Sequence, residues 1–394
     1  MQNSSQQRSE TSPVIKIGFS PLTDSAPLIV AKEQGYFAEQ GLNVELFKEV
    51  SWASIRDKLV FGEYDAAHML APMLMSTTLG AAGSIKKPLV TGYSFGLNGN
   101  AVSVSNALFD AMRELSGDLI HHPENSSNVL RKVVLDRQAN NLPKLRFAVV
   151  FPFSMHYYLL NHWLQTGGLK ANEDVEILVV PPSRVVQALE EGLIDGYCVG
   201  EPWNTHAVKR QVGVTVITGY EIWNNAPEKV LAVTQEWAQA NETVHKKLIW
   251  ALYQASAWID DEANRTVLFE MLAREAYVGA PISSIANAYA GQVSDPISKV
   301  SRSIPNFSLP HKYFANFPWQ SHARWILQQM IELGQVSADI KLEETARSVY
   351  LTGLYREVMQ AHGETVPDFD SKSEGLHSEP WVKGQFELGE DRFL

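Results

Sequence analysis

Short apolar runs alternate with amphipathic segments along the first two hundred residues. Apolar runs rich in β-branched residues are typical of buried strands, and apolar positions that recur every three to four residues are typical of helices. The sequence predicts strands at 14–19, 44–47, 65–70, 89–93, 101–104, 145–150, 175–180 and 195–199. It predicts helices at 26–40, 52–61, 131–139, 156–166 and from 183, and mainly helices after 202, at 245–263, 319–333 and 343–362. Strands that alternate with helices in this way predict parallel sheets covered by helices on both faces.

Two stretches about 130 residues apart contain the same order of strand, proline, helix and turn signals. In each, a strand ends in proline, a helix follows, and a G-x-x-D turn leads to another strand and a second proline. Pro21 and Pro72 are 51 residues apart, and Pro152 and Pro202 are 50 apart. The repetition predicts two similar lobes, and a cleft between two lobes is a common site for a small ligand. The alternative interpretation is that a common strand–helix–turn pattern recurs by chance.

The length of the chain also favours two lobes. Its 394 residues exceed the roughly 250–300 residues at which a single core usually stops growing. We expect lobe 1 to combine residues 14–100 with 202–394, including a helical C-terminal extension, and lobe 2 to comprise 101–201. Residues 1–13 are predicted to be a disordered tail, and the last thirty residues a tail that wraps the surface.

Composition excludes some classes of partner. Hydrophobic residues make up 45% and charged residues 20% of the chain, as in ordinary globular proteins. The net charge of −11 argues against direct binding of nucleic acid, because a phosphate backbone requires a basic face. An anion would gain nothing from this overall charge, so any anion site must be built from a few aimed donors.

Cysteine usage and the first residues bear on location. Cys198 is the only cysteine, which excludes an intrachain disulfide and a cysteine metal cluster. Residues 1–13 are polar and lack the apolar segment of a secretory signal, and no run of 18 apolar residues occurs. We therefore expect a cytoplasmic protein without membrane insertion.

Candidate anion donors stand just beyond the predicted strands, where ligands of such folds bind. Trp52 opens a helix and offers an indole N–H, and His156 opens another and can donate from its ring. Gly200 follows a strand and would let a ligand approach the backbone, and Lys229 could supply a positive charge. The alternatives are a core tryptophan, a packed histidine and a solvated lysine.

The other groups of polar residues in the sequence do not indicate a metal site or a catalytic site. The pair His121-His122 lies in a polar loop without further ligand spacing, and Asp260-Asp261-Glu262 is expected to face water on a helix. No nucleophile–base constellation and no phosphate-binding glycine loop is visible. The sequence therefore predicts no enzyme activity, no cofactor and no metal.

Four motifs together resemble the nitrate/bicarbonate-binding family of solute-binding proteins, over about residues 14–330. They are GFSPLTDSAPL at 18–28, SWASIRD at 51–57, CVGEPWN at 198–204, and EIW at 221–223 followed by PEK at 227–229. The resemblance implies an α/β, two-lobed periplasmic-binding-protein-like fold of type II. Each lobe would be a mixed, mainly parallel sheet flanked by helices, and the two would clamp one oxyanion.

The resemblance also implies the ligand contacts. The family's tryptophan, histidine, glycine and lysine fall on Trp52, His156, Gly200 and Lys229. Nitrate-binding members carry a glutamine in a turn that reads LDGQG. Here the turn reads LNGNA, so Asn100 takes that position and keeps the amide donor on a shorter arm.

Cytoplasmic members of this family resemble a nitrate/nitrite sensor that holds a response-regulator-like, RNA-binding antiterminator inactive. Binding of nitrate or nitrite would release that partner and regulate nitrate assimilation genes, and we expect this function. The alternative is a periplasmic nitrate or bicarbonate substrate-binding protein of an ABC transporter. Fungal thiamin-pyrimidine synthases share this type of fold, but they use a cysteine-rich iron motif that the single Cys198 cannot supply.

Overall fold

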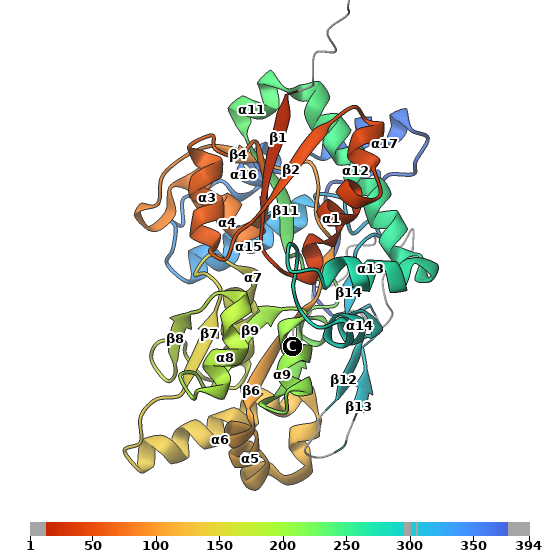
Figure 1. The fold of residues 1–394 in the computed structure, drawn as a ribbon. Helices are drawn as coiled ribbons and strands as arrows, with labels where there is room; N and C mark the ends of the chain where they lie inside the picture. Colours follow the sequence, from red (N-terminus) through yellow and green to blue (C-terminus); the bar gives the residue numbers. More distant parts are fainter. Residues whose placement is uncertain (1–12, 295–298, 300, 305, 377–394) are drawn as a thin grey trace, which may run out of the picture.

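Two five-stranded sheets, one in each lobe, organise the chain (Figure 1). The computed structural model describes residues 13–294, 299, 301–304 and 306–376. The first sheet has the order β2-β1-β3-β11-β4 and the second β10-β6-β9-β7-β8. The strands of lobe 1 are β1 (Val14–Phe19), β2 (Asn43–Lys48), β3 (Ala66–Leu70), β4 (Leu89–Val90) and β11 (Lys229–Thr234). Those of lobe 2 are β6 (Asn100–Ser105), β7 (Arg146–Val149), β8 (Glu176–Val179), β9 (Gly196–Gly200) and β10 (Gly213–Thr218).

Both sheets are mixed. In lobe 1, β1 runs parallel to β2 and β3, and β11 runs antiparallel between β3 and β4. In lobe 2, β7 runs parallel to β8 and β9, and β6 runs antiparallel between β9 and β10. The predicted fold class is therefore confirmed: two mixed sheets flanked by helices.

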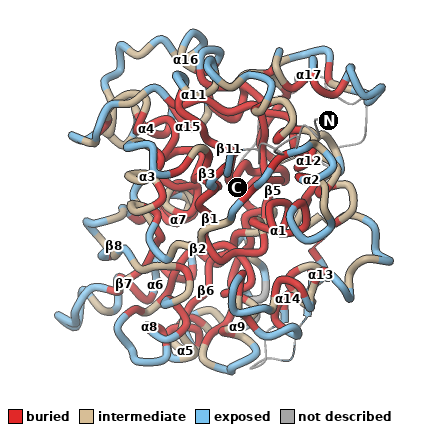
Figure 2. Tube along the Cα trace, turned by 45° about the horizontal axis from the view of Figure 1, so that its top comes forward, coloured by how far each residue is buried: buried red, intermediate tan, exposed pale blue. Residues whose placement is uncertain are grey.

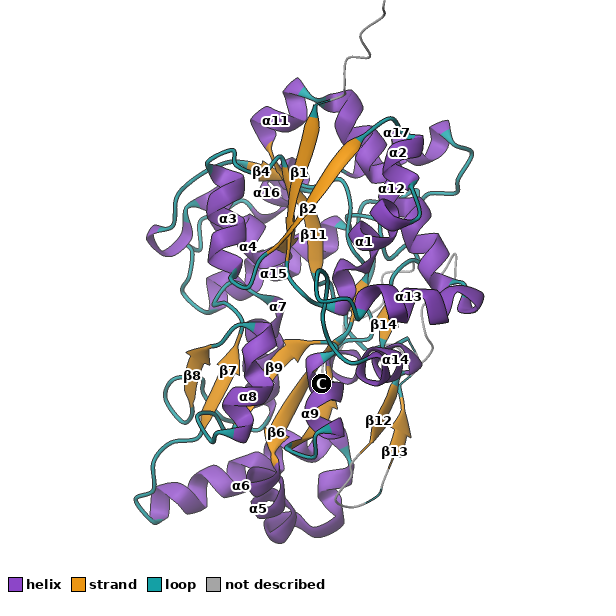
Figure 3. Ribbon diagram, in the orientation of Figure 1, coloured by secondary structure: helices purple, strands orange, loops and turns teal. Residues whose placement is uncertain are grey.

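Helices cover both faces of each sheet (Figure 3). Lobe 1 carries α1 (Ala26–Glu33), α2 (Tyr36–Glu39), α3 (Trp52–Val60), α4 (Ala71–Leu79), α11 (Gln235–Ala240), α12 (Glu242–Asp260), α13 (Arg265–Leu272), α15 (Gln320–Glu332), α16 (Leu342–Val349) and α17 (Thr352–Ala361). Lobe 2 carries α5 (Asn106–Ser116), α6 (Ser126–Ala139), α7 (Met155–Thr166), α8 (Val185–Glu190) and α9 (Trp203–Lys209), with α10 (Gly219–Ile222) after its last strand. Helix α14 (Ile282–Ala290) packs on α9. Two small sheets pair β12 (Gln292–Ser294) with β13 (Ser301–Ser303) and β5 (Leu97–Asn98) with β14 (Ser308–Leu309).

The core lies on the central strands, which are buried along their whole length (Figure 2). Every residue of β3 and β11 is buried, as expected for strands with helices on both faces. Lys229 begins β11, so a cation stands at the end of one of the most buried strands of lobe 1.

Two segments, 91–99 and 219–228, carry the chain between the sheets, and we call them the crossing segments. They are bonded to each other. The Asn98 amide nitrogen donates to the Asn224 carbonyl over 2.8 Å, and its oxygen accepts from the Ala226 N–H over 3.0 Å. The Phe95 N–H donates to the Lys229 carbonyl over 2.9 Å. The lobes therefore share a hydrogen-bonded, two-stranded junction.

The second lobe extends further than predicted. Its sheet continues past residue 201, because β10 pairs with β6 from Gly213 opposite Ser105. Ladder bonding draws this β-branched run into lobe 2, and the chain returns to lobe 1 only after residue 218. The predicted tail at 1–13 lies outside the described residues, except for Pro13.

The C-terminal segment lies across lobe 1 as far as the structure describes it. The Asp370 carbonyl accepts from the Gln320 N–H over 2.8 Å, and the Gly375 carbonyl accepts from the Asn224 N–H over 3.3 Å. The segment thus runs from the start of α15 to a crossing segment. In the described part of the chain no helix has the length and apolarity needed to cross a bilayer.

Candidate functional site

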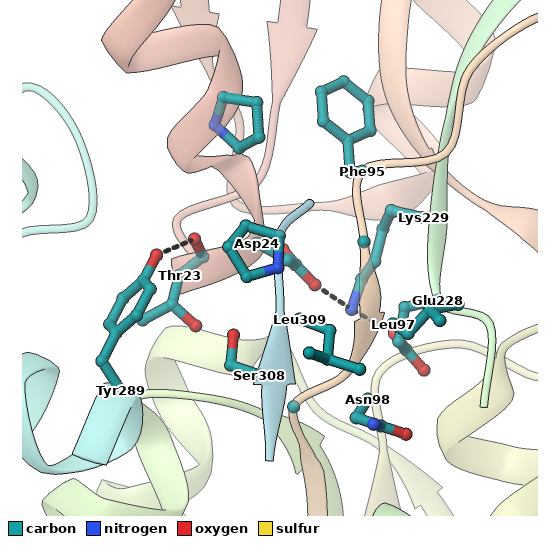
Figure 4. Close-up of a pocket in the computed structure, with 14 residues that line it drawn as sticks. Thr23, Asp24, Phe95, Leu97, Asn98, Glu228, Lys229, Tyr289, Ser308 and Leu309 are labelled. Atoms are coloured by element: carbon teal, nitrogen blue, oxygen red, sulfur yellow. Dashed lines mark hydrogen bonds and ion pairs between the residues drawn. The ribbon is translucent and has the colours of Figure 1, made fainter. Parts of the chain in front are cut away.

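A lysine ammonium lies fully buried between two carboxylates at the junction of the lobes (Figure 4). The Lys229 ammonium is 2.6 Å from Asp24 Oδ2 and forms an ion pair with Glu228. Asp24 belongs to the short 3-10 helix Thr23–Ser25 that follows β1. Burial disfavours the charge of Lys229, but the two carboxylates outweigh it and raise its pKa. Lys229 is therefore a charged, desolvated cation.

Asp24 links this cation to a pair of aromatic rings. Burial opposes its ionisation, but Lys229 and His68 outweigh burial and hold the pKa of Asp24 well below its usual range. His68 Nε2 lies 3.1 Å from Asp24 Oδ1, and burial lowers the pKa of His68. The rings of His68 and Trp52 lie 5.7 Å apart. Ser51 caps α3 by accepting from the Ser54 N–H, which places Trp52 at the first helical position.

Lobe 2 brings its own polar groups to the same point. Asn100 and Gly200 face each other at the ends of β6 and β9. The Asn100 amide donates to Glu228 Oε1, and His156 Nε2 lies 3.7 Å from Glu228 Oε2. A Cβ at Gly200 would lie 3.5 Å from Lys229 Nζ, so the backbone of lobe 2 closely approaches the ammonium.

Three buried rings of this cluster have nitrogens without a hydrogen-bond partner among the described residues. They are the indole of Trp52 and the imidazoles of His156 and His68, although His68 Nε2 also lies within ion-pair distance of Asp24. Burial, reinforced by the charge of Lys229, lowers the pKa of His156 well below its ordinary value, so the ring is neutral and carries one N–H. Buried donors without acceptors are costly, and a bound anion would satisfy them.

The structure thus brings the five sequence-predicted site residues into one cluster. Gly200, Asn100 and His156 surround Lys229 from lobe 2, through direct proximity or through Glu228. Trp52 lies behind His68 on the lobe 1 side. One ammonium and a set of neutral N–H groups are donors suited to a small anion.

Three members of the cluster were not predicted as site residues. Asp24 and Glu228 occur within motifs quoted above, and Glu228 directly precedes Lys229, but one carboxylate beside one lysine has no special meaning in a sequence. His68 is the only polar residue in the buried strand AAHML, and a single polar residue in an apolar strand could have indicated a functional role. Their roles depend on which buried charges meet in space.

The lobes are closed around this cluster. The Thr23 N–H donates to the Glu201 carbonyl over 2.9 Å, and the Trp203 indole donates to the Pro21 carbonyl over 3.2 Å. The cavity beside Lys229 has a volume of about 20 Å³, which is room for about one water molecule.

The described residues contain no group of three or more His, Cys, Asp or Glu side chains able to hold a metal ion. Cys198 lies buried in β9, two residues before Gly200, and burial raises the pKa of its thiol. A buried, protonated thiol is a poor nucleophile.

Comparison with known proteins agrees with this architecture. The crystal structure of the periplasmic nitrate-binding protein NrtA from Synechocystis PCC 6803 superposes with a TM-score of 0.84 at 27% identity, covering 92% of this chain and 93% of that one. A ligand-binding component of an ABC-type import system from Staphylococcus aureus superposes with a TM-score of 0.65 at 17% identity, covering 88% and 98%. The fold is that of a periplasmic-binding-protein-like substrate-binding protein.

The sequence comparisons show the family. The chain belongs to the NMT1-like family, whose profile matches residues 8–273. It is 30% identical to the nitrate/nitrite binding protein NrtA of Synechococcus elongatus, over 91% of this chain and 80% of that protein. It is 34% identical to the nitrate import ATP-binding protein NrtC of Synechocystis, over 82% of this chain and 46% of that protein. The chain thus spans about half the length of NrtC. The family resemblance inferred from the motifs is confirmed.

Proposed function

We propose that this protein binds a small planar oxyanion, nitrate or nitrite, between its two lobes. The observation that carries the proposal is a fully buried ammonium, Lys229, in one cluster with two buried donors, Trp52 and His156, that have no hydrogen-bond partner among the described residues. The NrtA relatives are nitrate/nitrite binding proteins by name, which supports the same ligand.

The arrangement of donors explains how such a site would select its ligand. Nitrate and nitrite are planar and always anionic at neutral pH. Their oxygens can accept from several donors at once, and charge-assisted bonds are short and directional. A spherical chloride ion would match separate N–H directions less well. Since the chain carries a net charge of −11, these local donors must supply the attraction.

Calorimetry of the purified chain with nitrate, nitrite, bicarbonate and sulfate tests the proposal. We expect saturable 1:1 binding of nitrate or nitrite and weaker binding of sulfate. His156→Ala should weaken nitrate binding at least tenfold, about 1.4 kcal/mol. His122→Ala is the matched control, because that ring is exposed in a lobe 2 loop. Absence of nitrate and nitrite binding in the wild type would refute the proposal.

We further propose that the anion is a signal and that the protein is a cytoplasmic sensor. In this mechanism the anion-free form holds a response-regulator-like, RNA-binding antiterminator, and anion binding releases it. Donors come from both lobes, so occupancy favours one lobe arrangement, and a ligand shifts an equilibrium by its differential affinity. Nitrate should dissociate such a complex on a sizing column, and a complex that persists at saturation would contradict this role.

A second candidate is the binding protein of an ABC importer for nitrate or bicarbonate. The names of the NrtA and NrtC relatives favour it. The two roles require different compartments. Two C-terminal fusions test this, one with a reporter that functions only in the periplasm and one with a reporter that functions only in the cytoplasm. Activity of the periplasmic reporter would support the importer role. An inactive periplasmic reporter together with an active cytoplasmic reporter would support the sensor role.

A further inference from the structure

The Glu228 carboxylate engages the donors that the proposed anion would need. Its Oε1 accepts from the Asn100 amide, and its Oε2 pairs with Lys229 and lies 3.7 Å from His156 Nε2. Its side chain is only 2% exposed. A carboxylate is a planar O–C–O group, and nitrate and nitrite present a planar O–N–O group to their donors. The side chain therefore imitates the proposed ligand.

Space leads to the same conclusion. The cavity of about 20 Å³ beside Lys229 is bordered by Glu228 itself (Figure 4). It has room for about one water molecule, whereas nitrite has three heavy atoms and nitrate four. An anion can enter this space beside the ammonium only if the Glu228 side chain moves out of its position.

Charge is the third consideration. Asp24 faces Lys229 from the turn after β1, His156 faces Glu228 from α7, and Cys198 lies nearby on β9. His156 and the Cys198 thiol are neutral, because burial opposes their ionised forms. One ammonium and two carboxylates give the cluster a charge of −1 with Glu228 ionised, and a bound anion would make it −2. Out of contact with water, such a charge is strongly disfavoured.

We propose that Glu228 is a specificity-determining residue that occupies the place of the anion in the empty site and takes up one proton when the anion binds. The proton comes from solvent and forms the carboxyl O–H, so that Glu-COO⁻, H⁺ and the anion become Glu-COOH and the bound anion. The cluster then keeps its charge of −1. The neutral carboxyl releases the Lys229 ammonium and can itself donate to an anion oxygen. This inference rests on the proposed oxyanion-binding function.

The acidity of Glu228 suits this role. Burial raises its pKa to about 7, and the attraction of Lys229 only partly opposes the rise. Below pH 7 the carboxyl is mostly neutral and the donors are available. Above pH 7 the ionised carboxylate competes for them. The affinity for nitrate should therefore be highest below pH 7 and fall about tenfold per pH unit above it.

Calorimetry between pH 6 and pH 9 tests the coupling. Titrations in two buffers of different ionisation enthalpy count the protons taken up with each nitrate. For the wild type we expect close to one proton at pH 8.5 and the tenfold fall per unit. Glu228→Gln replaces the carboxyl by a neutral amide of the same shape, so it should bind nitrate without proton uptake and with an affinity that pH does not change. Glu176→Gln, an exposed position on β8, is the matched control and should keep the wild-type profile.

The outcomes separate this inference from the proposed function. A wild type that binds neither nitrate nor nitrite at any pH defeats both. A wild type that binds nitrate without proton uptake, or a Glu228→Gln variant with the wild-type pH profile, overturns the inference alone. Near-ultraviolet circular dichroism checks that the variant folds. If it does not fold, the proton count of the wild type decides.

Discussion

Adding one methyl group at Gly200 should weaken anion binding without harming the fold. A Cβ there would lie 3.4 Å from Asn100 Oδ1, 3.4 Å from Leu22 Cδ2 and 3.5 Å from Lys229 Nζ. These are ordinary van der Waals distances. Gly200 ends a strand and does not use the left-handed backbone region, so alanine fits its conformation.

The methyl group would stand where an anion oxygen must approach the ammonium. An oxygen bonded to Nζ lies roughly 2.8 Å from it, inside the distance of the new Cβ. Loss of one hydrogen bond to a charged group costs about 1.5–3 kcal/mol, which corresponds to roughly tenfold to hundredfold weaker binding. We expect the free energy of unfolding to change by less than about 1 kcal/mol.

Titration calorimetry with nitrate and urea denaturation measure the two quantities separately. Gly353→Ala in α17 is the matched control, since nothing lies within 4 Å of its Cβ position, and it should bind nitrate like the wild type. A Gly200→Ala variant with wild-type affinity would refute the placement of the anion between β9 and Lys229. A variant that fails to fold would show that this contact is tighter than described.

Three further changes test other parts of the cluster and the fold. Trp52→Phe removes an indole N–H that has no hydrogen-bond partner among the described residues, so calorimetry should show about tenfold weaker nitrate binding, and an unchanged affinity would exclude Trp52 from the site. Lys229→Ala leaves Asp24 and Glu228 buried without their cation, and urea denaturation should show a loss of about 3–5 kcal/mol; a loss below about 1 kcal/mol would contradict the buried ion pairs. Burial opposes ionisation of Glu374, but His322 and Lys372 outweigh it and lower its pKa to about 2, below the unfolded value of about 4.3. The stabilisation from Glu374 is thus present above that unfolded value and lost as pH falls toward 2, and Glu374→Gln should flatten the stability profile in this window; an unchanged slope would count against the depressed pKa.

Most elements of the first two hundred residues were predictable, because each has its own apolar periodicity and is bounded by glycine or proline. The strand at 14–19 agrees with β1 residue for residue, and the helix predicted at 156–166 differs from α7 only in its first residue. The predicted helix at 26–40 is interrupted at Gly35, whose φ of 87° ends the helical path. That glycine was visible in the sequence, and its effect follows from backbone sterics.

Elements formed by distant pairing were missed. The runs that become β10 and β11 were included in a region predicted to be mainly helical, although GVTVIT and KVLAVT are rich in β-branched residues. The helix predicted at 343–362 is two helices, because Tyr350 bridges to Thr91 at the edge of the first sheet. Which edge a segment reaches is a property of the whole chain.

The site divides in the same way. Four of the five predicted residues, Asn100, His156, Gly200 and Lys229, lie together around Glu228 and Lys229, and Trp52 joins them through His68. The roles of Asp24, His68 and Glu228 could be assigned only from the three-dimensional structure. The role of a buried ionisable side chain depends on its neighbours in space and not on its position in the chain. The raised pKa of Glu228 in particular follows from burial, which no sequence pattern reports.

The bonded crossing segments have a mechanical consequence. Lys229 directly follows one of them, and its carbonyl accepts from Phe95 in the other, so the ammonium sits beside the pivot of any swing of one lobe against the other. Points near a pivot travel little, whereas α7 with His156 and α3 with Trp52 belong to separate lobes and would move with them. We therefore expect the ammonium to bind an incoming anion first and the donors on the two lobes to close on it afterwards. The rate at which the lobes reopen would then set the rate at which the anion dissociates.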